Sequence, residues 1–178
     1  MPRLVLIRHA APEVTAGLAP SRWPLSAAGR QAAKALAAGL GQFEFERIYA
    51  SREPKAAETA RLIGRALGVT VQVCEGLHEH EREREPFEVD REAFEAKVRL
   101  LFERPGERTY GMESGEAALG RFAAAVDDIV AQAAGRDVAV VAHGTVISLY
   151  VASKCGVDGF ELWRGLGTPA VVAISNTQ

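Results

Sequence analysis

Two short apolar runs that each end in a histidine constrain this chain more than any other feature. Leu4–Ile7 precedes the pair Arg8-His9, and Val138–Ala142 precedes His143. Aliphatic runs of this length predict buried strands of a parallel sheet. In an open α/β sheet, side chains at the carboxyl ends of such strands face the ligand crevice. The sequence therefore predicts two imidazoles that meet over one substrate.

Strands and helices are expected to alternate along the rest of the chain. The predicted strands cover residues 3–8, 47–50, 69–74, 137–142 and 170–174. The predicted helices run from Ser26 to about Leu40, Arg52 to Leu67, Asp90 to Glu103 and Ser114 to about Ala134, and another opens at His143-Gly144. This order predicts an α/β fold, a three-layer α/β/α sandwich with a mostly parallel central sheet.

The segment Ala10–Pro24, between the first strand and the first helix, is expected to be a loop that borders the site. It contains three prolines, which disrupt helix interiors, so no helix is predicted there. Trp23 in this loop and Phe87 further along the chain are candidates to shape the pocket for the leaving group.

Length and composition favour one domain that binds a small molecule. At 178 residues and 48% hydrophobic content, the chain can build one sizeable core, so we expect residues 1–178 to form a single domain. The formal net charge is -2 and the basic residues form no cluster, which argues against a nucleic-acid partner. No apolar run approaches the ~18 residues of a membrane span, so we expect a cytoplasmic protein with no membrane partner. A homodimer is the generic expectation for the oligomeric state.

The two cysteines, Cys74 and Cys155, are not predicted to form a functional pair. They lie far apart and lack the CxxC spacing of many metal and redox sites. Cytosolic thiols usually stay reduced, so we expect both to be buried packing residues and not a disulfide.

The pair Arg8-His9 suits phosphoryl transfer. A guanidinium binds phosphate oxygens in bidentate fashion, and a neutral imidazole can attack phosphorus to form phosphohistidine. The charge of Arg8 disfavours an imidazolium, so it should help to keep His9 neutral. His143 and the helix N–H groups that begin at Gly144 are placed to hold the equatorial oxygens of the same phosphate. His9 is therefore the candidate nucleophile and His143 the candidate transition-state stabiliser.

Further motifs follow one another in an order that resembles a known family. They are Leu4–His9, Leu25–Gly29, Ser51, Lys55-Ala56, Thr59-Ala60, Leu77–Glu79, Glu113-Ser114 and Val140–Gly144. Together they resemble the histidine phosphatase superfamily, also called phosphoglycerate mutase-like. The match runs over most of the chain, and the ordered set is specific although no single motif is.

The resemblance implies a role for each matched polar residue. It implies that His9 is phosphorylated in turnover, that Arg8 and Lys55 bind phosphate, and that His143 completes the pocket. Glu79 falls on the proton donor of the family. This assignment agrees with the chemistry, because an alkoxide leaving group needs a proton and a neighbouring phosphate dianion raises the pKa of a carboxyl group.

The chain departs from the family pattern at two positions. Ala10 replaces the glycine that usually follows Arg-His, a change that is tolerated unless the backbone there needs a positive φ. Lys55 replaces the usual arginine of the Ser-x-x-x-Arg-Ala stretch, which keeps the charge but loses the two-pronged grip on phosphate.

These observations predict a phosphomonoester hydrolase that acts through phosphohistidine on a small phosphorylated metabolite, with no metal or other cofactor. A phosphoglycerate mutase-type phosphotransferase is an alternative, but it would need a lid and carboxylate-binding groups to keep water from the phosphoenzyme. A non-catalytic phosphate-binding regulatory module is another, with Lys55 as its one positive hint. The identity of the substrate stays open.

A metal enzyme is a further rival. His78 and His80 are two residues apart, with Glu79 and Glu81 beside them, and on a strand the two rings would point to the same side. The HExxH spacing of metalloproteases is absent from this stretch.

Overall fold

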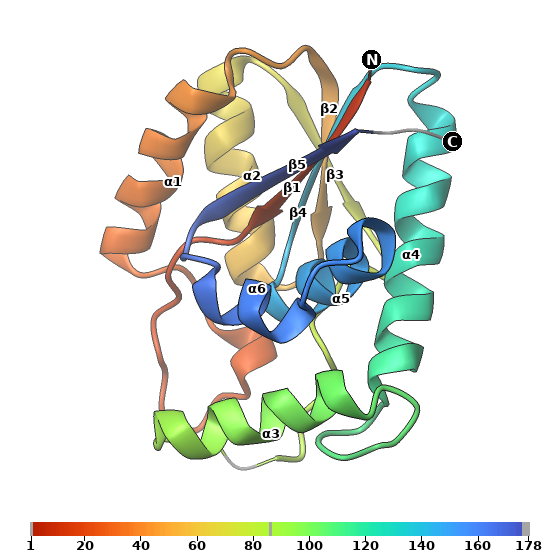
Figure 1. Ribbon diagram of the computed structural model, residues 1–178. Helices are drawn as coiled ribbons and strands as arrows, with labels where there is room; N and C mark the ends of the chain where they lie inside the picture. Colours follow the sequence, from red (N-terminus) through yellow and green to blue (C-terminus); the bar gives the residue numbers. More distant parts are fainter. Residues whose placement is uncertain (1, 86, 176–178) are drawn as a thin grey trace.

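A central sheet lies between layers of helices in the computed structural model of this chain, which describes residues 2–85 and 87–175 (Figure 1). The strands are β1 (Arg3–Arg8), β2 (Phe45–Ser51), β3 (Thr70–Cys74), β4 (Asp137–Ala142) and β5 (Ala170–Ser175). The helices are η1 (Pro20–Arg22), α1 (Ala27–Leu40), α2 (Pro54–Leu67), α3 (Arg91–Glu103), α4 (Gly115–Gln132), α5 (Gly144–Cys155) and α6 (Gly159–Gly165).

The five strands form one sheet in the order β3-β2-β4-β1-β5. Four of them run parallel, and β5 pairs antiparallel with β1 at one edge of the sheet. The predicted α/β fold with a mostly parallel sheet is thus confirmed. Since parallel strands end at the same edge, the residues that follow β1, β2 and β4 gather there.

Side chains alternate across the central strands and build an apolar core on each face of the sheet. On β1, Val5 and Ile7 pack into the core shared with α1 and α2, whereas Leu4 and Leu6 pack into the core shared with α4 and α5. Figure 1 shows α1 and α2 on one side of the sheet and α4 on the other. Because both faces are covered, the central strands appear in the sequence as continuous apolar runs.

The helix starts follow from local capping. The Ser26 hydroxyl accepts a hydrogen bond from the N–H of Gly29, and the Ser114 hydroxyl accepts one from Ala117, so both predicted N-caps are confirmed. The second helix begins at Pro54, two residues later than predicted. Proline suits a first helical turn, because the N–H that it lacks has no partner inside the helix there.

Two helical segments differ from the sequence-based expectation. The loop 10–24 contains the short helix η1, so the prediction of no helix is wrong at those three residues. Pro20 stands at the start of η1, where a proline is tolerated. Helix α6 lies outside the predicted helices because its seven residues, with Phe160 as the one buried residue, are too short to show an apolar period.

The prediction of two buried cysteines is wrong. Cys155 is exposed and Cys74 is partly buried, and both are free thiols. Cys155 is the last residue of α5, directly before Gly156, whose positive φ ends the helix in solvent.

Within the described part of the chain, no helix has both the length and the apolar character needed to cross a bilayer.

Helix α3 lies at the end of the molecule toward which the parallel strands run (Figure 1). Its N-cap is Asp90, whose carboxylate accepts hydrogen bonds from the N–H groups of Glu92 and Ala93. Its buried residues are Val98 and Leu101, and it packs against α6. The helix therefore covers the end of the molecule near the carboxyl ends of the parallel strands.

Neighbouring leucines on α3 test this packing. Leu101 is 1% exposed and Leu100 is 38% exposed. We expect Leu101→Ala to lower the free energy of unfolding by about 2–5 kcal/mol, because it leaves a cavity. The matched control Leu100→Ala should lower it by less than about 1 kcal/mol. Urea denaturation of both variants measures the difference, and equal losses would contradict the described packing of α3.

Candidate active site

The strand register brings the two predicted histidines together. Arg8 on β1 pairs with Ala142 on β4, so His9 and His143 are the next residues on two adjacent parallel strands. Their ring centroids lie 5.1 Å apart at an interplanar angle of 63°. The two imidazoles therefore meet at one edge of the sheet, as predicted from the sequence.

The His9 ring is buried and held by the main chain. Its Nδ1 lies 2.7 Å from the carbonyl oxygen of Ala10. A carbonyl oxygen only accepts, so Nδ1 carries the hydrogen and Nε2 keeps its lone pair. Burial, followed by the charges of His143 and Lys55, lowers the pKa of His9 well below its usual value. Arg8 acts in the same direction but is the smallest of these causes.

Ala10 fits its position without backbone strain. Among the described residues, Ala134 is the one non-glycine residue with a positive φ, so Ala10 does not occupy the conformation that favours glycine. Its N–H donates to the Thr59 hydroxyl at 3.1 Å, and that hydroxyl donates to the Lys55 carbonyl at 2.7 Å. The exchange of glycine for alanine is therefore tolerated here.

His143 is completely enclosed and is the N-cap residue of α5. Its Nε2 lies 2.8 Å from the Ser51 hydroxyl and 3.5 Å from a carboxylate oxygen of Glu53. Its Nδ1 has no hydrogen-bond partner among the residues that the structure describes. Burial and then the charge of Lys55 lower the pKa of His143 well below its usual value. Both histidines are consequently neutral at pH 7.

Arg8 lies against the start of α5. A Cβ atom on Gly144 would come within 3.1 Å of the guanidinium, so glycine permits this close approach. The Nη1 of Arg8 donates to the Leu166 carbonyl, while its buried Nε has no hydrogen-bond partner in the described chain. A partly buried cation with an open donor beside a helix N-terminus is suited to an anion.

The carboxylate of Glu79 occupies the N-terminus of α5. It accepts hydrogen bonds from the N–H groups of His80 at 2.9 Å, Thr145 at 3.2 Å and Val146 at 3.3 Å. The helix N–H groups expected to hold phosphate oxygens thus bind a side-chain carboxylate in this structure.

The surroundings of Glu79 favour its ionised form. Burial alone would raise its pKa, but the charge of Arg82, the neighbouring His143 and the N–H groups of His80 and Thr145 outweigh burial. The pKa of Glu79 therefore lies below its usual value. A substrate anion placed beside it would act in the opposite direction.

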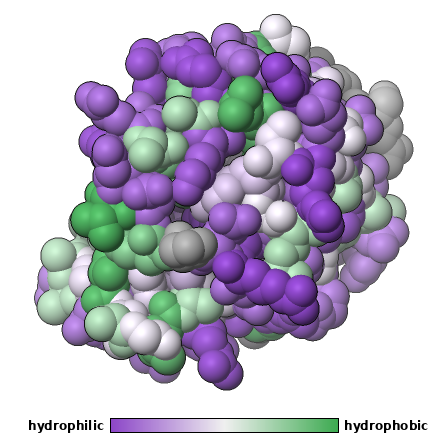
Figure 2. All heavy atoms as spheres, turned by 90° about the horizontal axis from the view of Figure 1, so that it is seen from below, coloured by the Kyte–Doolittle hydropathy of each residue, from purple (hydrophilic) through white to green (hydrophobic). Residues whose placement is uncertain are grey.

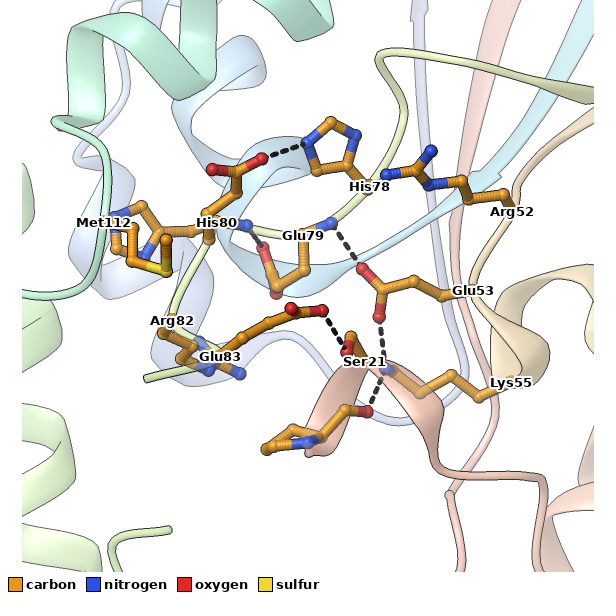
Figure 3. Close-up of a pocket in the computed structure, with 12 residues that line it drawn as sticks. Ser21, Arg52, Glu53, Lys55, His78, Glu79, His80, Arg82, Glu83 and Met112 are labelled. Carbon is orange, nitrogen blue, oxygen red and sulfur yellow. Dashed lines mark hydrogen bonds and ion pairs between the residues drawn. The ribbon is translucent and has the colours of Figure 1, made fainter. Parts of the chain in front are cut away.

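Lys55 is buried and bound to groups of the protein. Its ammonium donates to the Pro20 carbonyl at 2.7 Å and to the Glu53 carboxylate at 2.5 Å. The other carboxylate oxygen of Glu53 accepts the N–H of Glu79 at 2.8 Å. Figure 3 shows the contacts from Lys55 through Glu53 to the Glu79 backbone. Glu53 thereby links Lys55 to Glu79 and, at 3.5 Å, to His143.

Two cavities meet at this site. They share Pro20, Lys55, Glu79 and Arg82. The first is polar, and Figure 3 shows the residues that line it. The second adjoins Arg8 and His9 and is lined by the predicted Trp23 and Phe87. Viewed from this end, the surface is mostly hydrophilic, with hydrophobic residues gathered along one side (Figure 2).

The histidines considered for a metal site contact different groups. Residues 78–81 lie outside the strands, so the strand geometry assumed for them is wrong. His78 Nε2 lies 3.2 Å from the Glu81 carboxylate, and His80 Nε2 lies 2.9 Å from the Glu113 carbonyl oxygen. Their rings therefore do not converge on one point through these atoms.

Comparison with known families and structures agrees with this geometry. The family model of the histidine phosphatase superfamily (branch 1) matches residues 4–176. This chain belongs to the histidine phosphatase superfamily. No curated protein matches the chain.

Solved structures share the fold over nearly the whole chain. A mycobacterial glucosyl-3-phosphoglycerate phosphatase is similar with 25% identity and a TM-score of 0.74, covering 97% of this chain and 89% of that chain. A phosphoserine phosphatase variant from Entamoeba histolytica has 20% identity and a TM-score of 0.70, covering 97% and 90%. A phosphoglycerate mutase from Bacillus anthracis has 20% identity and a TM-score of 0.71, covering 97% and 87%. The last two likenesses show the fold alone.

Sequence reasoning missed two charged residues of this histidine phosphatase site. Glu53 is buried against Lys55, and Arg82 borders both cavities. The stretch Glu79–Glu85 alternates acids and bases in a way typical of solvated surface, so Arg82 carries no distinct signal. Glu53 could have been found from its place between Ser51 and Lys55, two matched motif positions.

The neutral histidines make stability depend on pH. Because folding lowers the pKa of His9, the unfolded chain binds more protons, and the stability present above pH ~6.5 is lost as the pH falls. We expect His9→Gln to reduce the pH slope of the free energy of unfolding between about pH 6.5 and 5 by up to about 1.4 kcal/mol per pH unit. Urea titrations at a series of pH values measure the slope, and an unchanged slope would show that His9 is not buried neutral.

Glu53 should compete with phosphate for Lys55. Replacing its carboxylate by an amide keeps an oxygen for the Glu79 N–H but removes a negative charge beside the cation. We expect Glu53→Gln to tighten inhibition by inorganic phosphate about tenfold and to lower stability, since Lys55 loses its buried partner. Glu58→Gln is the matched control, because Glu58 lies on the same helix but pairs with Arg30. Weaker phosphate binding in Glu53→Gln would contradict this account.

Proposed function

We propose that this protein hydrolyses phosphomonoesters of small metabolites through a phosphohistidine intermediate on His9. The observation that carries the proposal is the pair of buried, neutral imidazoles 5.1 Å apart, beside Arg8 and Lys55 at the N-terminus of α5. The cations and helix N–H groups suit a phosphoryl group, and the unprotonated Nε2 of His9 suits attack on phosphorus. The similarity to a protein named glucosyl-3-phosphoglycerate phosphatase supports hydrolysis as the net reaction.

In the first step, Nε2 of His9 attacks phosphorus while the ester P–O bond breaks. Arg8, Lys55 and His143 stabilise the equatorial oxygens of the transition state. The bound phosphate dianion raises the pKa of Glu79, which takes up a proton and gives it to the leaving alkoxide. The alcohol departs, and phosphohistidine remains.

In the second step, water attacks the phosphohistidine. Glu79, now a carboxylate, accepts a proton from the water while the Nε2–P bond breaks. Inorganic phosphate leaves and His9 returns to its neutral form. The hydrogen bond from Nδ1 to the Ala10 carbonyl orients the ring in both steps.

Variants of the nucleophile and the proton donor test this mechanism. We expect His9→Ala to abolish turnover and to prevent formation of an acid-labile, base-stable phosphoenzyme. We expect Glu79→Gln to slow alkyl phosphates by about 10²–10⁴-fold and activated aryl phosphates far less, because an acidic leaving group needs no proton. Glu58→Gln serves as the control.

Steady-state kinetics on both ester classes, with rapid-quench trapping of the phosphoenzyme, measure these effects. Turnover that survives in His9→Ala would refute the role of His9 as the nucleophile. Equal losses of rate on both ester classes in Glu79→Gln would refute the role of Glu79 as the proton donor.

A further inference from the structure

The cavity beside His9 has aromatic walls. Four aromatic residues line it together with Arg8, His9, Lys55 and Glu79: Trp23, Phe87, Phe94 and Tyr110. Its volume is about 220 Å³, below the ~300–1,000 Å³ typical of sites for drug-sized ligands. Glu79, the proposed proton donor, borders this cavity, so the rest of the leaving alcohol can extend into it.

The aromatic walls are held in place by the fold. Trp23 is buried, and its indole N–H donates to the Leu18 carbonyl at 3.1 Å. The Phe87 ring meets the Trp23 ring edge to face, with centroids 5.0 Å apart. These contacts fix one wall of the cavity before a ligand arrives, which favours binding of a rigid partner.

A second pair of aromatic rings lines the same cavity. Phe94 from α3 and Tyr110 lie edge to face with centroids 6.2 Å apart. The guanidinium of Arg82 lies 5.2 Å from the centroid of the Phe94 ring. A planar group that enters this cavity would therefore find aromatic rings contributed by three separate segments of the chain.

Charged side chains of both signs surround the aromatic rings. Glu85 and Glu88 also line this cavity. Glu88 is paired with Lys97 at 2.9 Å, and the Lys97 ammonium lies 5.8 Å from the centroid of the Tyr110 ring. The cations of the phosphate site, by contrast, lie next to His9. Arg82 lines the same cavity, so basic groups offset these acids and the aromatic rings are what distinguish it from the polar cavity.

We infer that the natural substrates are phosphomonoesters of compact alcohols that carry a flat aromatic or heteroaromatic group. This inference rests on the proposed phosphatase activity and specifies its substrate class. Aromatic rings that stack on the walls gain affinity beyond the burial of apolar area. Phosphorylated hydroxy acids and small polyols lack such a ring.

A matched substrate series tests the inference. 2-Phenylethyl phosphate and propyl phosphate are both esters of primary alcohols, so leaving-group acidity contributes little to the comparison. We expect kcat/KM for the phenylethyl ester to exceed that for the propyl ester, for glycerol phosphate and for 3-phosphoglycerate by at least about tenfold.

Phe87 and Phe43 provide a variant and its control. Phe87 is 53% exposed, so Phe87→Ala leaves the core intact. We expect it to reduce the ratio of kcat/KM for the phenylethyl ester over the propyl ester by about threefold or more. Phe43 stacks on Phe45 at the start of β2, at the opposite end of the sheet, and Phe43→Ala should leave this ratio unchanged.

The outcomes separate the inference from the proposed function. Equal kcat/KM values for the aromatic and aliphatic esters, or a preference for 3-phosphoglycerate, would overturn the substrate class. Formation of the phosphoenzyme in the same experiments would still support the proposed phosphatase activity. Failure to hydrolyse any ester or to form a phosphoenzyme would overturn the proposed function. A preference for the phenylethyl ester that Phe87→Ala does not reduce would overturn the role of this cavity.

Discussion

The pairing of β1 with β4 is the interaction on which the candidate site depends. Because Arg8 lies opposite Ala142, the next residue on each strand is a histidine, and the two rings need no flexible loop to meet. Apolar cores on both faces of the sheet hold this register, since a shift by one residue would turn every side chain of β1 to the wrong face. The relative position of His9 and His143 is thus fixed by the most buried part of the molecule.

Carboxylates of the protein contact two of the positive groups of the site. Lys55 is neutralised by Glu53, and the N-terminus of α5 is covered by Glu79. Both carboxylates lie where a phosphoryl group would bring further negative charge. In the proposed mechanism, the negative charge of the bound phosphoryl group raises the pKa of Glu79, and this repulsion makes the ionised carboxylate a proton donor. Burial is the main cause that lowers the pKa of both histidines.

Much of this arrangement is predictable from the sequence, because local rules and global packing agree there. Apolar runs locate β1 and β4, and serine caps locate the starts of α1 and α4. The short helix α6 and the exposed thiol of Cys155 depend on tertiary context at helix ends, which periodicity does not reveal. Glu53 contacts Lys55, Glu79 and His143, which come from segments far apart in the chain. Contacts between such distant segments cannot be predicted from the local pattern of a single sequence.

The hydrogen bond between His9 and its neighbour's carbonyl oxygen has a stereochemical consequence. Its acceptor belongs to the main chain, so no substitution of the side chain at position 10 removes it. With Nδ1 occupied, the phosphoryl group can be carried only on the nitrogen remote from the backbone. In the proposed mechanism the covalent adduct is therefore the tele isomer of phosphohistidine, and a main-chain carbonyl group determines this regiochemistry.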